Sequence, residues 1–275
     1  MEVYLAENLG FCYGVKRAIQ LAEDSVSPDT RSYTLGSIIH NPQMVARLAE
    51  EGIGKIESLD EIASGTVIVR SHGVGPDVYD KIAKKGLGLV DATCPHVKKA
   101  QSAARQLADA GYQVVIVGDK NHPEVRSILE WAGEGAVAVN AEEEAEALPR
   151  YGRLGIVSQT TFSGARFRKI VSIMLDKSPN IRILRTICTA TDQRQAAAVK
   201  LACQVDMMIV VGGRNSANTT KLAQLCQEKC KTYHIETADE VCDEWFATIK
   251  KIGITAGAST PDWIIKEVYE KCQKK

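Results

Sequence analysis

The chain has 275 residues, 45% of them hydrophobic and 25% charged, which is enough for one large α/β domain or two to three small ones with a sizeable core. Its 34 basic and 34 acidic side chains balance to a formal net charge of zero, which excludes a broad basic surface for nucleic acid. No stretch reaches the length of a membrane span and the first residues lack a signal-peptide pattern, so we expect a cytoplasmic protein with neither nucleic acid nor membrane as a partner.

Strand-like apolar segments alternate along the chain with segments of helical periodicity. Three of them run directly into a cysteine that opens a helix, at residues 2–11, 87–93 and 181–187. Six further apolar runs each end in a small polar loop, at residues 32–42, 66–76, 113–124, 152–161, 206–218 and 251–259. The acidic segment 140–152 is typical of a solvated helix and turn. Strands that alternate with helices predict parallel sheets built from βαβ units.

The unit of strand, cysteine and helix occurs three times, and its cysteines, Cys12, Cys94 and Cys188, are 82 and 94 residues apart. We therefore predict an α/β fold of three quasi-equivalent lobes whose parallel sheets surround a common centre. The predicted lobes are residues 1–94 with Cys12, His40 and His72; residues 95–188 with His122, Glu124 and Thr160; and residues 189–275 with Ser216, Asn218 and Ser259. Cys94 and Cys188 fall at the lobe junctions.

Three thiolates that meet at one centre suit a soft metal. Tetrahedral zinc usually draws its ligands in closely spaced pairs, whereas Cys12, Cys94 and Cys188 come one from each lobe. The pattern fits an iron–sulfur cubane with three protein thiolates and one iron left open for substrate. The alternative is three structural cysteines, because free cysteine is often buried.

The other five cysteines have weaker patterns. Cys226 and Cys230 lie four residues apart and could form a zinc pair with His234, but this is also the spacing of a helix face in the core. Cys203 lies on a helix with one apolar face, and Cys242 and Cys272 have no local partner pattern. In the cytosol, these side chains are not expected to form disulfides.

The six polar loops share a chemistry of histidine, hydroxyl and amide groups without a dense cluster of Lys and Arg. Such groups suit a diphosphate in an enclosed cavity beyond the carboxyl ends of the strands. Several loops enter a helix through proline, and helix N-termini add free N–H groups for an anion. The candidates are His40 and Asn41; His72; Asn121, His122 and Glu124; Gln159, Thr160 and Thr161; Asn215, Ser216 and Asn218; and Ser259 and Thr260.

Glu124 is an acid in a set that otherwise suits an anion. Burial beside an anion would raise the pKa of its carboxyl group, and a carboxyl that is protonated near neutral pH is a proton donor. The hydroxyl of Thr160 could relay that proton. The alternative is that Glu124 only serves as a capping carboxylate in the first turn of a helix.

Nine segments, in order, closely resemble the 4-hydroxy-3-methylbut-2-enyl diphosphate reductase family, also called IspH or LytB. They cover essentially the whole chain and are NLGFCYGVKRAI, IIHNPQMVARL, SHGVGPDV, DATCPHVKKA, NHPEV, SQTTFS, TICTATDQRQ, NSANTTKL and ITAGASTPDWII. The resemblance implies a three-lobed fold around a 4Fe–4S cluster. It also implies the last step of the methylerythritol phosphate route to isoprenoids, in which an allylic alcohol diphosphate is reductively dehydroxylated to isopentenyl and dimethylallyl diphosphates.

The resemblance further implies roles for individual residues. Cys12, Cys94 and Cys188 would hold the cluster. Glu124 and Thr160 would deliver the proton, with His122 beside them. The implied substrate pocket contains His40, His72, His122, Thr160, Ser216, Ala217, Asn218 and Ser259. A ferredoxin or flavodoxin is the implied electron donor.

The chain departs from the usual family pattern at three positions. Ala217 stands where a second serine usually follows Ser216, so one hydroxyl is missing, although a backbone N–H could remain. Ser127 stands where glycine commonly follows the HPEV motif, and Gln101 replaces a common histidine after the Cys94 motif. We expect these changes to affect fine geometry and not the class of reaction.

Three other functions make different demands on the sequence. A nicotinamide-dependent dehydrogenase needs G-x-G-x-x-G between its first strand and helix, and neither GFCYGV nor HGVGPDV fits. A non-enzymatic zinc or redox-sensing protein would use Cys226 and Cys230. A diphosphate-binding module would not need Cys12. Bound iron with acid-labile sulfide, as opposed to zinc, separates the reductase from the zinc protein.

Overall fold

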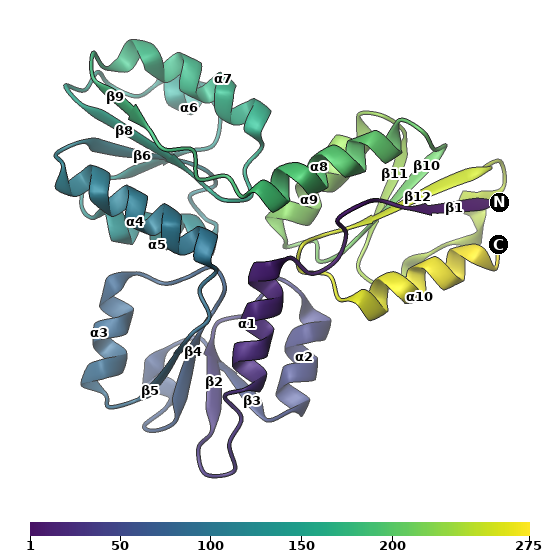
Figure 1. The fold of residues 1–275 in the computed structure, drawn as a ribbon, viewed down its shortest axis with the longest axis horizontal. Coiled ribbons are helices and arrows are strands. Elements are labelled where there is room, and N and C mark those ends of the chain that lie inside the picture. Colours follow the sequence, from purple (N-terminus) through teal and green to yellow (C-terminus); the bar gives the residue numbers. More distant parts are fainter. The chain divides into compact units, whose positions relative to one another are not determined.

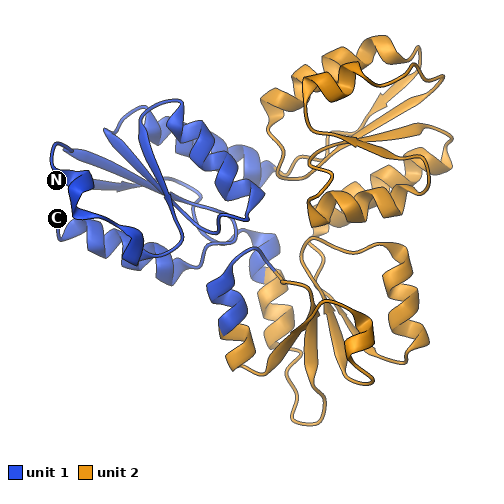
Figure 2. Ribbon diagram, turned by 180° about the vertical axis from the view of Figure 1, so that it is seen from behind, with its two compact units in different colours: residues 1–16, 39–46, 189–275 blue, residues 17–38, 47–188 orange.

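The computed structural model describes residues 1–275, and its strands form three four-stranded parallel sheets (Figure 1). The chain divides into two compact units (Figure 2). The first unit combines residues 1–16, 39–46 and 189–275 and contains one sheet, and the second combines residues 17–38 and 47–188 and contains two. The predicted α/β class with three lobes of parallel sheet is confirmed. None of the helices combines the length and the apolar character needed to cross a bilayer.

The first lobe is built on the sheet of order β3-β2-β4-β5. Its strands are β2 (Ser32–Leu35), β3 (Ile53–Ile56), β4 (Thr66–Val69) and β5 (Gly88–Asp91). The helices of this part of the chain are α1 (Tyr13–Glu23), α2 (Pro42–Glu50), α3 (Pro76–Lys84) and the 3-10 turn η1 (Leu59–Glu61). The unit boundary falls within α1 and α2. The apolar residues of β4 are fully buried, as expected for the central strand of a covered parallel sheet.

The second lobe has the order β7-β6-β8-β9. Its strands are β6 (Gln113–Val117), β7 (Val137–Val139), β8 (Leu154–Ser158) and β9 (Ile181–Ile183). Its helices are α4 (Pro95–Asp109), α5 (Pro123–Ala132), α6 (Glu142–Glu146), α7 (Gly164–Met174) and η2 (Leu175–Lys177). Alternate residues of β6 face opposite sides of the sheet, so Ile116 packs in the cluster of Leu107 and Val117 packs in the cluster of Phe167.

The third lobe lies in the first unit and has the order β1-β12-β10-β11. Its strands are β1 (Glu2–Leu5), β10 (Met207–Val211), β11 (Lys231–Ile235) and β12 (Lys251–Ala256). Its helices are α8 (Thr189–Ala202), α9 (Ala217–Gln227), η3 (Ala238–Glu240), η4 (Asp243–Phe246) and α10 (Asp262–Gln273). Every residue of β10 is buried, because both faces of the sheet are covered by apolar clusters.

The three sheets have the same strand order once β1 is counted after β12. Each has an edge strand that precedes a cysteine, which is β5, β9 or β1. The predicted first lobe of residues 1–94 is therefore wrong at its start, because Glu2–Leu5 pairs with Lys251–Ile254 of the third lobe. The first strand lies at the edge of the sheet formed by the end of the chain, and Cys12, like Cys94 and Cys188, lies where the chain leaves one sheet for the next.

Candidate functional site

Cys12, Cys94 and Cys188 occupy corresponding places in the three lobes. Each follows an edge strand and precedes a helix, and each is partly exposed. Their backbone N–H groups donate to the loop after the neighbouring strand, at Ala258 O (3.1 Å), Ser71 O (3.0 Å) and Thr160 O (2.9 Å), respectively. The same hydrogen bond thus ties each cysteine to a loop that carries a predicted pocket residue, which is Ser259, His72 or Thr160.

The turn before Cys94 is held by charge and hydrogen bonds. Asp91 accepts a hydrogen bond from the Thr93 N–H at 3.0 Å and pairs with Lys98 at 2.6 Å. Burial opposes ionisation of Asp91, but the hydrogen bonds from Lys98 and Thr93 prevail and lower the pKa of its carboxyl group. Arg17 donates to the Thr93 carbonyl at 3.3 Å. The start of α4 is therefore anchored one residue before the thiol.

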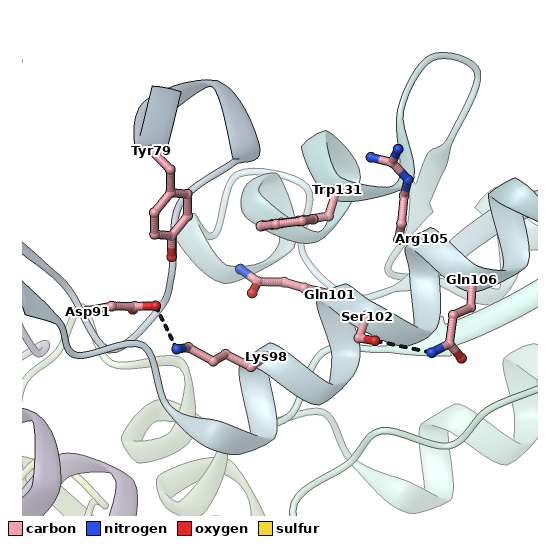
Figure 3. A pocket seen from close by; sticks show the side chains of 8 residues that line it. All are labelled: Tyr79, Asp91, Lys98, Gln101, Ser102, Arg105, Gln106 and Trp131. Atoms are coloured by element: carbon pink, nitrogen blue, oxygen red, sulfur yellow. Dashed lines mark hydrogen bonds and ion pairs between the residues drawn. The ribbon is translucent and has the colours of Figure 1, made fainter. Parts of the chain in front are cut away.

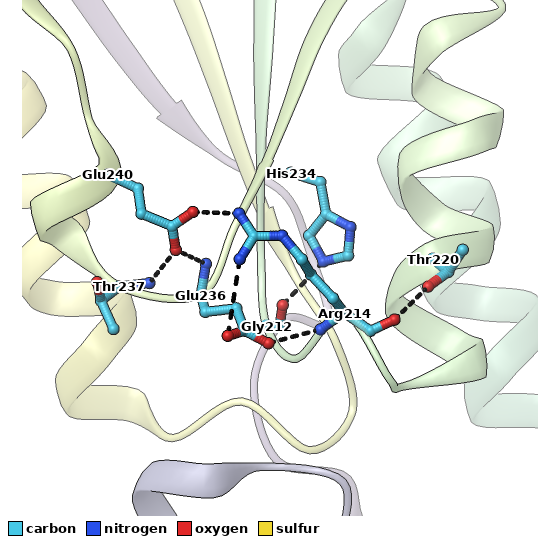
Figure 4. Close-up of polar contacts among 7 residues, drawn as sticks. All are labelled: Gly212, Arg214, Thr220, His234, Glu236, Thr237 and Glu240. Atoms are coloured by element: carbon cyan, nitrogen blue, oxygen red, sulfur yellow. Dashed lines mark hydrogen bonds and ion pairs between the residues drawn. The ribbon is translucent and has the colours of Figure 1, made fainter.

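The remaining cysteines differ in their surroundings. Cys226 and Cys272 are fully buried, and burial raises the pKa of the Cys226 thiol to about 12 and that of Cys272 to about 11. Both side chains pack within apolar clusters of the third lobe, as core residues do. His234 directs its Nε2 at the Gly212 carbonyl, 2.8 Å away (Figure 4). Core packing of Cys226 and this histidine contact favour the structural interpretation over the zinc pair.

Glu124 reaches from the start of α5 to the loop after β8. One carboxylate oxygen accepts from the Thr160 N–H at 2.6 Å, and the other accepts from the Thr160 hydroxyl at 2.9 Å. The residue is only 2% exposed. Burial raises the pKa of the Glu124 carboxyl group to about 7, although both hydrogen bonds from Thr160 oppose the shift. The side chain therefore does more than cap its own helix, and near neutral pH it is poised between its two protonation states.

Two histidines of the second unit lie edge to face. The rings of His72, after β4, and His122, before α5, have centroids 5.5 Å apart and planes inclined by 80°. His122 is the N-cap of α5, and its Nδ1 accepts from the Glu124 N–H at 3.2 Å. In a neutral ring the proton then resides on Nε2, which is a hydrogen-bond donor. The structure thus brings His72, His122, Glu124 and Thr160 together at the strand ends of the two lobes.

The first unit gathers the other predicted pocket residues. Ser259 donates its hydroxyl to the His40 carbonyl at 3.2 Å, and a Cβ at Gly213 would lie only 2.8 Å from that same carbonyl. Ser216 is the N-cap of α9, and Ala217 is its first residue. The N–H of residue 217 is thus in the first turn of a helix, where backbone N–H groups have no partner within the helix.

Asn218 is the strongest sign of a ligand in this unit. It is 5% exposed, and neither its amide nitrogen nor its amide oxygen has a hydrogen-bond partner. A buried amide without partners is costly, which makes Asn218 a candidate to contact a polar ligand.

The loop that leads to Ser216 is fixed by Arg214 (Figure 4). The Arg214 N–H donates to Glu236 at 2.7 Å, and its guanidinium pairs with Glu236 and Glu240. Since both acids neutralise it, Arg214 positions the loop and is not a spare cation for an anion. This agrees with a pocket that relies on hydroxyl, amide and imidazole groups.

Arg194 was missed by the sequence analysis. It is buried on α8 and donates from Nη2 to the Gly10 carbonyl at 2.7 Å, two residues before Cys12. Gly10 has φ +78°, and a side chain there would meet Asp262. A partner 184 residues away leaves no local signal in the sequence, although Arg194 lies within the segment TICTATDQRQ that carries the family resemblance.

The family described as LytB protein matches residues 3–273 of this chain. The chain is 49% identical to the 4-hydroxy-3-methylbut-2-enyl diphosphate reductase of Geobacter metallireducens, over 100% of this chain and 98% of that protein. It is 50% identical to the enzyme of the same name from Syntrophotalea carbinolica, over 98% of each.

Two solved structures resemble the chain. One is (E)-4-hydroxy-3-methyl-but-2-enyl diphosphate reductase, described as the terminal enzyme of the non-mevalonate pathway, with 44% identity, full coverage of both chains and a TM-score of 0.74. The other is E-1-hydroxy-2-methyl-but-2-enyl-4-diphosphate reductase from Plasmodium falciparum, with 30% identity, a TM-score of 0.93, and 98% of this chain and 87% of that one covered.

Proposed function

The chain belongs to the LytB family, and we propose that it is a 4-hydroxy-3-methylbut-2-enyl diphosphate reductase of the non-mevalonate route to isoprenoids. The observation that carries this proposal is the similarity over the full length to enzymes of that name, at about half of all positions. The products are isopentenyl and dimethylallyl diphosphates. The reaction replaces the allylic C–O bond with a C–H bond, consumes two electrons and two protons, and releases water.

We propose that Cys12, Cys94 and Cys188 hold a 4Fe–4S cluster with one iron left open. Their equivalent positions and partial exposure support this, as does the packing of Cys226 and Cys272 in the core. A set of three thiols is chemically suited to iron–sulfur ligation. When bound, the cluster supplies the electrons and a Lewis-acidic position for the leaving hydroxyl group.

The side chains that we propose for diphosphate binding are those with hydroxyl, amide and imidazole groups. From the first unit, Asn218 offers its unpartnered amide, and Ser216, Ala217, Ser259 and His40 contribute hydroxyl, backbone N–H and imidazole groups. The resemblance implies the same role for His72, His122 and Thr160. Donors of this kind bind the anion without a dense cationic cluster, and the start of α9 adds its helix dipole. Anchoring the diphosphate orients the hydroxyl group for reaction.

Glu124 is proposed as the proton donor. Because burial raises the pKa of its carboxyl group to about 7, Glu124 can hold a proton near neutral pH. When Glu124 is protonated, its O–H can donate to the Thr160 oxygen, and the Thr160 hydroxyl then donates onward to the leaving oxygen, because a hydroxyl both accepts and donates. His122 helps to orient Glu124, because the His122 Nδ1 accepts a hydrogen bond from the Glu124 backbone N–H. This first proton lets the hydroxyl group leave as a neutral water molecule. The second proton forms the new C–H bond of the product.

The electron donor is proposed to be a ferredoxin or flavodoxin, on the strength of the resemblance. The cytosol is the proposed compartment, because there the cysteines stay reduced. We envisage neither nucleic acid nor a membrane as a partner.

The direct test is turnover under anaerobic conditions. Reconstituted protein is mixed with 4-hydroxy-3-methylbut-2-enyl diphosphate and a chemical reductant, and the products are identified by mass spectrometry. We expect isopentenyl and dimethylallyl diphosphates. Iron-loaded protein that binds the substrate but forms neither product would contradict the proposal and favour a non-enzymatic diphosphate-binding or redox protein.

A further inference from the structure

The segment after β4, residues 72–75, is held by side chains of the second lobe. The Ser127 hydroxyl lies 3.1 Å from the His72 carbonyl. The Trp131 Nε1–H donates to the Val74 carbonyl at 2.9 Å, and the Gln101 amide nitrogen approaches the same carbonyl at 3.5 Å. Both lobes belong to the second unit. We call Gln101, Ser127 and Trp131 the clamp.

Two members of the clamp, Gln101 and Ser127, are among the three positions at which the chain departs from the family pattern. Gln101 donates from its amide nitrogen to the Ser127 hydroxyl oxygen at 3.1 Å. They are 4% and 2% exposed, respectively. Glycine at position 127 has no hydroxyl group and cannot accept this bond. The two departures are therefore one interacting pair and not independent changes.

The hydrogen-bonding capacity of the pair is matched to its partners. The two amide protons of Gln101 have Ser127 Oγ and Val74 O as acceptors. The single hydroxyl proton of Ser127 lies within reach of the Glu124 carbonyl at 2.8 Å and the His72 carbonyl at 3.1 Å. One buried hydroxyl group thus joins the backbone of the proposed proton donor to the backbone of a proposed pocket histidine.

Gly73 allows this close contact. It has φ +73°, and a Cβ there would lie 2.4 Å from the Gln101 amide nitrogen. On its other side, Gln101 lines a cavity of about 380 Å³ with Tyr79, Asp91, Lys98, Trp131 and neighbouring residues of α4 (Figure 3). The Gln101 side chain therefore both lines this cavity and bonds to the Ser127 hydroxyl group.

We propose that Gln101 and Ser127 are positioning residues that fix His72 relative to His122 and Glu124. The inference rests on the proposed function, because it assigns these two histidines and Glu124 to substrate binding and protonation. Loss of the pair frees the His72 segment to shift. Diphosphate binding then weakens. The chemical step also slows, because the Glu124 carboxyl group is no longer correctly placed relative to the substrate.

The test is a cycle of variants that exchanges the pair for the family residues: Ser127→Gly, Gln101→His and the double variant. Holoenzymes are compared for the Kd of isopentenyl diphosphate by calorimetry, for kcat and KM, and for melting temperature. Each single variant is expected to raise the Kd about three- to tenfold, the scale of one lost neutral hydrogen bond. The fold-change in Kd of the double variant is expected to be smaller than the product of the two single fold-changes, because the positions are coupled.

Ser102→Ala is the matched control. Ser102 lies next to Gln101 on α4 and lines the same cavity, but its hydroxyl bonds only to the exposed Gln106. It should change neither the Kd nor the rate. If a single variant does not fold, the double variant is compared with Ser127→Ala, which keeps the helix propensity of position 127.

Fold-changes in Kd that multiply across the two positions, or single variants with wild-type Kd and kcat, would overturn the positioning role while leaving the reductase proposal intact. A wild-type holoenzyme without turnover would instead contradict the reductase proposal, whatever the variants do.

Discussion

Both oxygens of the Glu124 carboxylate accept hydrogen bonds from one residue, Thr160, the first from its N–H at 2.6 Å and the second from its hydroxyl at 2.9 Å. Thr160 also offers its carbonyl to the Cys188 N–H at 2.9 Å. One residue thus links the buried acid to a cysteine that we propose as a cluster ligand. The loop after β8, which contains Thr160, therefore contacts both the proposed proton donor and a proposed cluster ligand.

Glu124→Gln should keep the cluster and bind substrate but slow the chemical step by roughly a hundredfold or more, the scale for loss of a general acid. The amide has nearly the same shape and still accepts from the Thr160 N–H. Thr160→Val should slow the step less, because water can replace a relay. The measurement is single-turnover reduction with a chemical reductant, so that docking of an electron donor does not limit the rate. Wild-type turnover by Glu124→Gln would show that the proton comes from another group.

The same carboxyl group should make stability depend on pH. Its folded-state pKa, about 7, exceeds the ordinary value of 4.5, so the folded protein holds the proton more tightly than the unfolded chain. This contribution to the free energy of unfolding is fully present below pH 4.5 and is lost as the pH rises through about 7. The loss is on the order of 3 kcal/mol. Melting temperatures of wild type and Glu124→Gln should therefore diverge across this range in favour of the variant. Parallel curves from pH 5 to 8 would contradict the raised pKa.

Asn218→Leu should separate ligand affinity from stability. Because the Asn218 amide is buried without partners, its replacement should leave the ligand-free protein as stable or more stable. The Kd of isopentenyl diphosphate should rise roughly ten- to hundredfold, the scale of lost hydrogen bonds to a charged group. Calorimetry and thermal unfolding of the same samples measure both.

Thr255→Val is the control for this prediction. Thr255 is buried on β12 with an unpartnered hydroxyl group and has no assigned role in the pocket. It should match Asn218→Leu in stability but keep the wild-type Kd. Equal losses of affinity in both variants would indicate a general effect on the third lobe and no specific contact of Asn218 with the ligand.

The central strands were predictable from their continuous apolar runs, because parallel strands buried on both faces require them. The edge strands β1, β5 and β9 are more exposed and were predicted from the cysteine and helix that follow each of them. The opposite edge strands β3, β7 and β11 were missed, because they have neither a long apolar run nor such a motif. The segment 140–152 was correctly predicted to contain a helix. That β1 joins β12 was not predictable from local pattern, since parallel pairing carries no signature of the partner.

At the candidate site, loop chemistry predicted Glu124 and Thr160 as partners in proton transfer, and the two residues are hydrogen-bonded in the structure. The Gln101–Ser127 bond and the reach of Arg194 to Gly10 were not foreseen, because both join positions far apart in the chain. Sequence spacing places a residue on an element, but only the packing of α4 against α5 brings position 101 to position 127.

The central claim is that one cysteine from each lobe junction holds the cluster. The most direct measurement is the iron and acid-labile sulfide content of anaerobically purified wild type and of Cys12→Ser, Cys94→Ser and Cys188→Ser, with the exposed Cys203→Ser and Cys242→Ser as controls. Wild type and controls should contain about four iron and four sulfide per chain and absorb broadly near 400 nm. Each of the three variants should lose iron and turnover. A Cys188→Ser protein with full iron and wild-type turnover would contradict the account.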